Sequence, residues 1–345
     1  MFGKNTPFIS LGKNWTVTDA HRDIKEKYKS LLAPGFFTSL LDGYTADYFD
    51  TPVVLSAPGT DLAGIRLVFA KDDDVVKCYP VRSEIYGDTG RRNVHYQMRE
   101  PITGIFALMP VLTDNINKGD SVKAISTVEK INRQSYKLLK NVTNMTLVSK
   151  IMSGNLPEAA VLNLSSLVDN LAVSVKTVEK NVDISVFTDK DIFVNGNMQL
   201  LTTGILNLIS NSINFCSEEQ IKIEIKLTKE KDRAIFSYSD NSKGIKDEYL
   251  QQVFKPYFSK DPFADGESDP SMGLGLFITK SAFEQTGGRI MLTSSFGNGV
   301  KYNISIPLVK DTDIVIESSA TDFLLNRYSE LFVQLCESCL LPELK

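Results

Sequence analysis

Apolar positions between residues 94 and 152 repeat with the period of an α-helix. In the first part of this stretch the apolar side chains are three or four residues apart: Met98, Ile102, Ile105, Met109, Leu112 and Ile116. After NKGD at residues 117–120, a second run with helical spacing extends to residue 152. A stripe of this kind is typical of helices that pack along their length. The pattern therefore predicts two long helices joined by a short loop, an antiparallel hairpin.

Each helix of this hairpin carries a wider apolar stripe than the other helix can cover. Pairing with a second copy would complete a four-helix bundle. The pattern therefore favours a homodimer through residues 91–153. The alternative is a hairpin that packs only against other parts of its own chain.

From residue 154 to 310 the pattern changes to strands that alternate with helices. IKIEIKLTK and AIFSYSD have the alternation of half-buried antiparallel strands, and RIMLTSS and KYNISIPL follow later. One helix is expected to end in NLISNSINF, and another to begin after SMGLGL. This order predicts a two-layer α/β sandwich with a mixed sheet that helices cover on one face.

The two ends of the chain have weaker patterns. In residues 1–90, Thr18 and Asp19 are expected to cap a helix that continues to Leu31, and PVVLSAP, GIRLVFA and VVKCYPV are expected to be short strands. This small α+β region is either an input domain or a purely structural unit. Residues 311–345 form a predicted helical tail, with Leu324, Tyr328, Leu331 and Leu335 at helical spacing. We expect the tail to dock on the rest of the chain rather than on a partner, and the fold class to be α+β.

Composition narrows the classes of function. The chain has 345 residues, of which 42% are hydrophobic and 23% charged, as in a globular protein of two or three domains. A net charge of −4 leaves no basic surplus to neutralise phosphates, which argues against binding of nucleic acid. No apolar run approaches the ~18 residues of a membrane span, and the first thirty residues lack the core of a signal peptide. We therefore expect a cytoplasmic protein that does not interact with a membrane.

The four cysteines add no clear chemistry. Cys336 and Cys339 form a CxxC pair, whereas Cys78 and Cys216 stand alone. A zinc site usually needs further cysteine or histidine ligands, and neither histidine is near this pair in the sequence. We therefore expect free or buried thiols, with a zinc site as the alternative.

Two of four short motifs contain polar side chains suited to a nucleotide. Asn207 and Asn211 are one helical turn apart, and an amide oxygen is a suitable ligand for Mg²⁺. Asp240 begins the segment DNSKGI after a predicted strand. A carboxylate fixed there can accept a hydrogen bond from the amino group of adenine. The alternatives are a polar helix face and a turn that needs its aspartate and its glycine.

The other two motifs follow further along the chain. FKPYF at residues 254–258 contributes aromatic side chains, which usually pack. SMGLGL at residues 271–276 opens a helix, where glycines allow backbone amides to approach a phosphate. The preceding segment, KDPFADGESDP, has the composition of a mobile lid.

Together with GGRI and FGNG further on, the order and spacing of these motifs resemble the ATP-binding domain of sensor histidine kinases, which has the nucleotide site of gyrase and Hsp90. MREPITGI, followed by a helical hairpin, is similar to the dimerisation and phosphoacceptor segment of that family. The resemblance implies ATP and Mg²⁺ as cofactors. It implies that Asn211 holds Mg²⁺ and that Asp240 recognises adenine. It also implies that the chain at Gly273 and Gly275 allows the lid to close around the phosphates. The other residues at the implied nucleotide site are Asn207, Asn214, Ser242, Gly244, Phe254, Ser271, Leu274 and Leu276.

The chain departs from the family pattern at four of these positions. Ser242 and Ser271 stand where glycine is usual, and Asn214 stands where a lysine commonly assists the phosphates. Asn207 stands where relatives that hydrolyse ATP carry a glutamate general base. Without that base water is poorly activated, so plain ATP hydrolysis is not the expected main activity.

The phosphoacceptor is ambiguous. The family's acceptor histidine lies five residues before the proline of this segment, which is Tyr96 here, while His95 lies six residues before Pro101. One residue turns a helix by ~100°, and the apolar stripe continues back to His95, so a regular helix would bury His95 and expose Tyr96. A kink before Pro101 would instead turn His95 outward as the acceptor.

The resemblance implies a function for the whole chain. It implies a protein that binds Mg-ATP, moves the γ-phosphoryl group to a histidine and then passes it to an aspartate of a response-regulator partner. The alternatives are a degenerate pseudokinase that acts as a regulatory or interaction module, and a kinase of protein hydroxyl groups. The expected domains are residues 1–90, 91–153, 154–310 and 311–345.

Overall fold

The computed structural model describes residues 7–43, 45–49, 53–56, 65–72, 75–82, 88–156, 158–259, 271–310 and 315–342. The chain forms two compact units, Met1–Arg91 and Arg92–Lys345, and each is described by itself. Among the described residues, no helix combines the length and the apolar character needed to cross a lipid bilayer.

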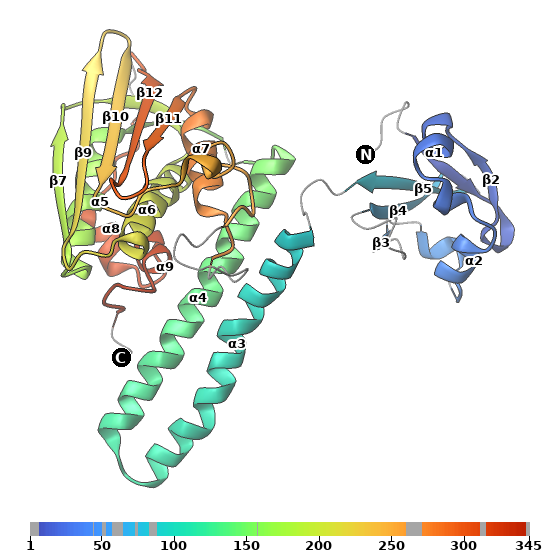
Figure 1. Ribbon diagram of the computed structural model, residues 1–345, viewed down its shortest axis with the longest axis horizontal. Coiled ribbons are helices and arrows are strands. Elements are labelled where there is room, and N and C mark those ends of the chain that lie inside the picture. Colours follow the sequence, from blue (N-terminus) through green and yellow to red (C-terminus); the bar gives the residue numbers. More distant parts are fainter. Residues whose placement is uncertain are drawn as a thin grey trace. The chain divides into compact units, whose positions relative to one another are not determined.

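The first unit is built on a five-stranded antiparallel sheet (Figure 1). Its strands, in order across the sheet, are β2 (Val17–Ala20), β1 (Ile9–Leu11), β5 (Val75–Arg82), β4 (Ile65–Asp72) and β3 (Val53–Ser56). The same unit contains two short helices, α1 (Arg22–Lys27) and α2 (Phe36–Leu40). The buried rings of Phe37 and Phe49 both pack on Phe69, with centroids 6.1 and 5.5 Å from its own. The three short strands predicted between residues 52 and 81 are confirmed.

The predicted start of the first helix is wrong. Thr18 and Asp19 lie in β2, and α1 begins only at Arg22. The cap is His21, whose Nδ1 accepts a hydrogen bond from the backbone N–H of Asp23 at 3.3 Å. Asp19 is opposite Ser10 of β1. This pairing across the sheet outweighs the local capping preference of Thr18 and Asp19, because strand formation depends on neighbours in space.

The predicted hairpin is confirmed as two long helices, α3 (Asp88–Asn117) and α4 (Ser121–Ser153). Gly119 has a φ of +67° in the connecting turn, and the Asp120 side chain caps α4 by accepting the N–H of Lys123 at 3.1 Å. Helix α3 continues through Pro101 and Pro110. Its backbone is helical at residues 95 and 96, but the side chains of His95 and Tyr96 lie outside the described part of the structure. Which of the two faces outward stays a prediction.

Several apolar side chains of the hairpin are not covered within one chain. Between 40% and 80% of their surface is exposed. We call this set the exposed hairpin stripe: Ile102, Phe106, Met109, Ile116, Val122 and Ile125. The stripe agrees with the inference that one copy of the hairpin cannot cover its own apolar surface.

The next part of the second unit is a two-layer sandwich. Its sheet contains β11 (Arg289–Ser294), β12 (Val300–Pro307), β10 (Arg233–Asp240), β9 (Ile221–Glu230) and β7 (Val182–Thr188), in that order. Only the β7–β9 pair of this sheet is parallel. Helices α5 (Leu164–Val178), α6 (Met198–Phe215) and α7 (Gly275–Gln285) cover one face (Figure 1). A two-stranded sheet, β6 (Ala160–Asn163) with β8 (Phe193–Gly196), lies beside it. The predicted α+β class and the mixed sheet are confirmed.

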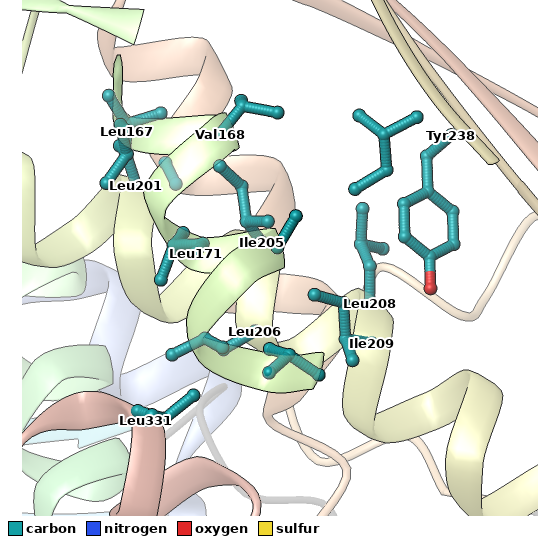
Figure 2. Packing of buried hydrophobic residues seen from close by; sticks show 14 of the residues in the cluster. Leu167, Val168, Leu171, Leu201, Ile205, Leu206, Leu208, Ile209, Tyr238 and Leu331 are labelled. Atoms are coloured by element: carbon teal, nitrogen blue, oxygen red, sulfur yellow. The ribbon is translucent and has the colours of Figure 1, made fainter. Parts of the chain in front are cut away.

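The core of the sandwich lies between the sheet and its helices. Figure 2 shows leucine, valine and isoleucine side chains of α5 and α6 packed together, with Tyr238 of β10 beside the end of α6. Helix α6 is buried on nearly all sides from Leu200 to Ser210. The buried stretch contains polar as well as apolar side chains, namely Thr202, Thr203, Asn207 and Ser210.

The tail forms two short helices, α8 (Ala320–Leu325) and α9 (Glu330–Gln334), rather than one. The Asn326 side chain accepts the N–H of Tyr328 at 3.0 Å, a local turn that competes with helix continuation. Leu331 and Leu335 are buried in the core of the second unit, so the predicted docking of the tail is confirmed, while Tyr328 remains 65% exposed.

Candidate functional site

A cavity opens beside the C-terminal half of α6, at the start of α7 and at the ends of β10 and β12. It has an empty volume of about 910 Å³, including space open to solvent. Its wall is mainly apolar, with side chains from α6, α7, β12 and the segment after β10: Leu208, Phe215, Ile245, Val253, Leu276, Val300 and Tyr302. An apolar slot with a few polar groups is the usual form of a small-molecule site.

Asp240 is the carboxylate of this cavity, and its position is fixed by the surrounding backbone. One oxygen, Oδ1, accepts the N–H groups of Ser242 at 3.0 Å and Val300 at 3.1 Å. The other, Oδ2, accepts a short hydrogen bond from the Ser212 hydroxyl. These donors use three of the roughly four acceptor positions of a carboxylate. Asp240 therefore retains capacity to accept a hydrogen bond from a molecule in the cavity.

A buried tyrosine supports this carboxylate from behind. The hydroxyl of Tyr238 lies 2.6 Å from the Ser212 hydroxyl, which in turn contacts Asp240. Burial, reinforced by the charge of Asp240, raises the pKa of Tyr238 well above its usual value, so the phenol stays protonated. A protonated phenol can donate to Ser212, which leaves the serine hydroxyl free to donate to Asp240.

Two glycines allow the backbone to close around the site. Gly273 has a φ of +67°, and a side chain there would collide with the backbone of Phe258. Gly299 has a φ of +73°, and a side chain there would collide with the carbonyl of Asp240. Both positions therefore require glycine for conformation and for space.

The three asparagines of α6 have different environments. Asn207 is only 4% exposed, and its Nδ2 donates to the carbonyl of Gly275 at 3.4 Å, which ties α6 to the start of α7. Asn211 lies on the cavity wall. Asn214 is exposed, and its Nδ2 donates to Glu337 of the tail at 3.3 Å.

A second cavity continues from the first toward the hairpin. It has an empty volume of about 1330 Å³, including open solvent, and five residues line both cavities: Asn211, Phe215, Ser271, Gly273 and Gly275. Its far wall comes from α3, α4 and the tail: Gln97, Glu100, Pro101, Lys137, Lys140, Asn141, Asn144 and Glu337. Of the α3 residues in this wall, Gln97 directly follows residue 96 in the sequence. An elongated molecule could therefore extend from Asp240 to the helix that carries His95.

Most of the residues singled out in the sequence meet around these cavities. The first cavity brings together Asn211, Asp240, Ser242, Gly244, Ser271, Gly273, Gly275 and Leu276. Asn207, Asn214 and Leu274 line the second cavity. Phe254 lines neither and packs against the core, with Lys280 Nζ 5.8 Å from its ring centroid. The expected lid, residues 260–270, lies outside the described residues.

Sequence reasoning missed the support of Asp240 and most of the apolar wall. Ser212 follows Asn211 directly, and Tyr238 precedes Asp240 by two positions, so both were next to selected residues. Two residues along a strand place side chains on the same face. This spacing could have identified Tyr238 as a neighbour of Asp240. The cavity residues on other elements have no such spacing relative to Asp240 that would have identified them.

The donor set limits which metal could bind. Within the described residues, no group of three or more His, Cys, Asp or Glu side chains is arranged to hold an ion. Cys336 and Cys339 are both buried, and burial raises their pKa values to about 11 and about 12, so they form no thiolate pair near neutral pH. A cation at the cavity would depend on Asn211 and on oxygens of a bound molecule, which is the way Mg²⁺ is commonly held beside phosphates.

Comparison with known proteins connects this geometry to a family. Residues 196–310 match the family of histidine kinase-, DNA gyrase B- and HSP90-like ATPases. The chain is 28% identical over 222 residues to hybrid signal transduction histidine kinase B of Dictyostelium discoideum, covering 62% of this chain and 11% of that protein. It is 27% identical over 224 residues to a sensor-like histidine kinase of Mycolicibacterium smegmatis, covering 64% of this chain and 57% of that protein.

A solved histidine kinase of Acinetobacter baumannii is 17% identical with a TM-score of 0.46, covering 62% of this chain and 98% of that one. The part of this chain that matches the two curated relatives corresponds to about a tenth of the length of the first and about three fifths of the length of the second. The residues that match the family include residues that line the first cavity, among them Asn211, Asp240 and Gly273. On this sequence similarity, residues 196–310 are a histidine kinase-like ATPase domain, and the similarity to histidine kinases extends over 62–64% of the chain.

Proposed function

We propose that the protein binds Mg-ATP in the first cavity and presents the γ-phosphoryl group to helix α3. The observation that carries this proposal is the continuity of the two cavities. The first holds Asp240 in an apolar slot, and the second reaches Gln97 and Pro101, next to residues 95 and 96. This continuity would let a nucleotide in the first cavity approach the hairpin of the same chain.

In this proposal each element has a defined task. Asp240 accepts a hydrogen bond from the adenine amino group, and Asn211 supplies an amide oxygen to Mg²⁺. Ser242 and Gly244 shape the adenine end of the slot, while Ser271, Gly273 and Gly275 border the phosphates. The mainly apolar wall excludes water, which strengthens these polar contacts.

The domains take the corresponding roles. Residues 91–153 pair two copies through the exposed hairpin stripe and carry the acceptor, and residues 154–310 hold the nucleotide. The phosphoryl group would pass from a histidine of α3 to an aspartate of a response regulator. Because the reaction consumes ATP, we expect it to take place in the cytoplasm.

A second candidate function is an ATP-binding regulator without kinase activity. It is favoured by the spacing of His95, six residues before Pro101, together with the asparagine at position 214. In that case nucleotide binding and the hairpin would serve to hold partners. A third candidate, transfer to a hydroxyl group of another protein, is favoured only by the resemblance of the ATPase domain.

Two measurements on the full chain test the proposal. Titration calorimetry with Mg²⁺ in excess should show ATP binding that weakens when Mg²⁺ is chelated. Absence of any ATP binding would refute both of the leading functions.

Incubation with γ-labelled ATP then separates the kinase from the regulator. If α3 is a regular helix, the wild type should show little acid-labile label, because in-line transfer needs the acceptor within about 3–3.5 Å of phosphorus. The double variant His95→Gln with Tyr96→His restores the family spacing and should label more strongly. Strong labelling of the wild type that disappears in His95→Gln would instead identify His95 as the acceptor.

A further inference from the structure

Two lysines of the hairpin line the second cavity opposite the ATPase domain. Lys137 and Lys140 lie on α4 and are the lysines among the described residues that line this cavity. The side chain of Lys140 is only 16% exposed, so its charge is partly withdrawn from water. A partly desolvated cation attracts an anion more strongly than a cation in open solvent.

The anion beside Lys140 comes from the tail. Oε2 of Glu337 lies 3.3 Å from Nζ of Lys140 and 3.3 Å from Nδ2 of Asn214. The nearby charge of Lys140, reinforced by that of Lys137, lowers the pKa of Glu337, which keeps the carboxylate ionised. The Glu337 side chain is still 36% exposed, so another anion can approach the same donors.

This group of donors is at the phosphate end of the proposed nucleotide site. Asn211, Ser271 and Gly273 line both cavities, and the second cavity continues from them to Lys140 and Glu337. A chain of phosphates that leaves the first cavity past Asn211 therefore enters the space beside Glu337. Phosphate oxygens and carboxylate oxygens bind the same cationic and amide donors.

We propose that Lys140, with Lys137 and Asn214, forms an anion subsite for the terminal phosphate of a bound nucleoside triphosphate, and that Glu337 competes with this phosphate for the subsite. The inference rests on the proposed function and adds two features to it. The hairpin supplies the positive charge that Asn214 cannot supply, and the tail controls access to that charge. A diphosphate is one phosphate shorter and does not reach the subsite.

The test compares ATP with ADP on the full chain, by calorimetry with Mg²⁺ in excess. Glu337→Gln removes the competing charge and keeps an oxygen for Asn214. It should raise ATP affinity about two- to fivefold, the range expected for one partly exposed ion pair. ADP affinity should stay the same within error. Adding Lys140→Gln to Glu337→Gln should remove the gain for ATP and again leave ADP unchanged.

Matched controls separate the subsite from a change in net charge. Glu129→Gln and Lys130→Gln alter exposed charges of α4 that do not line the cavity, and neither should change the ratio of ATP to ADP affinity. Thermal melting of Glu337→Gln monitors docking of the tail. A loosened tail would change ATP and ADP binding together.

The outcomes distinguish this inference from the proposed function. If wild type and Glu337→Gln both bind ATP and ADP, and the affinity ratio is equal in the two proteins, the subsite is refuted while the nucleotide site stands. An equal gain for both nucleotides also refutes it. If none of the proteins binds either nucleotide, the proposed function and the subsite fail together.

Discussion

Asp240 illustrates how one residue obtains its role from several parts of the chain. Its two oxygens accept from the backbone of Ser242 and Val300 and from the Ser212 hydroxyl. The donors come from α6, from the turn after β10 and from the start of β12. Asp240 also lines the cavity, so its remaining acceptor capacity is available to a molecule bound there.

The first prediction concerns this acceptor. Asp240→Asn replaces one oxygen by an NH₂ group that faces existing donors, and it removes the charged acceptor for adenine. Loss of a hydrogen bond to a charged group costs about 1.5–3 kcal/mol, so ATP affinity should fall by about 10- to 100-fold in calorimetry. Asp183→Asn on the exposed face of β7 is the control and should bind ATP as the wild type does. Wild-type affinity in Asp240→Asn would show that Asp240 does not contact the nucleotide.

The second prediction compares two glycines of the same turn. Gly297 and Gly299 have φ values of +90° and +73°, so alanine is strained at both. At Gly297 the added methyl group meets nothing within 4 Å, whereas at Gly299 it collides with the Asp240 carbonyl. Gly297→Ala should lower the free energy of unfolding by about 1 kcal/mol, and Gly299→Ala by at least ~1 kcal/mol more. Urea denaturation measures both values, and equal losses would contradict the close approach of this backbone.

At the scale of elements, α3 and α4 differ from the helices of the sandwich in how their apolar surface is covered. Helix α6 buries its apolar side chains against the sheet, α7 and the tail. The hairpin leaves Phe106, Ile116 and Ile125 more than 60% exposed. Exposed apolar surface that is repeated along two helices usually marks an interface.

The third prediction tests that interface. Phe106→Glu places a charge within the exposed hairpin stripe, and burial of an unpaired charge is unfavourable, so it should convert a dimer into a monomer. Phe187→Glu is the matched control, since Phe187 is 59% exposed on β7, away from the hairpin. Sedimentation at micromolar concentration measures the mass of each protein. A wild type that sediments as a monomer would refute the homodimer.

At the scale of the whole second unit, the tail connects α4 to the ATPase domain. Arg133 of α4 donates to the carbonyls of Cys336 and Cys339 at 2.5 and 3.2 Å. Asn144 and Gln334 exchange two buried hydrogen bonds, at 2.9 and 3.4 Å. On the other side, Leu340 N–H donates to the carbonyl of Val178 in α5. Docking of the tail therefore holds the hairpin and the sandwich together.

The fourth prediction uses the tail cysteines as reporters of this docking. Burial raises the pKa of Cys336 to about 11 and of Cys339 to about 12, so little reactive thiolate forms at pH 8. In the wild type a thiol reagent should label Cys216, which is half-buried, before either tail cysteine. Arg133→Met removes the two hydrogen bonds and should speed labelling of Cys336 and Cys339, as followed by mass spectrometry.

Arg99→Met is the control for this prediction. It changes an exposed arginine of α3 and should leave the labelling rates unchanged. Unchanged labelling in Arg133→Met would show that Arg133 does not hold the tail.

Local periodicity determined much of this architecture from the sequence alone. The steps of three and four residues gave α3 and α4, and the alternation in residues 221–229 and 234–240 gave β9 and β10. The spacing of Asn211, Asp240, Gly273 and Gly275 indicated the family and selected residues that share one cavity. These features were accessible because helix and strand periods, and the need for glycine at left-handed turns, act over a few neighbouring residues.

Only the tertiary structure decided the features that join distant residues. Thr18 and Asp19 became part of a strand because Asp19 is paired with β1, although their residue types favour a helix cap. Lys140 and Glu337 are 197 positions apart, and nothing in either local sequence connects them. Tyr238 appeared in the sequence as one more strand residue, and its support of Asp240 depends on Ser212 from another element. Such contacts follow from how separate elements pack against each other, and that packing has no counterpart in the local pattern of residues.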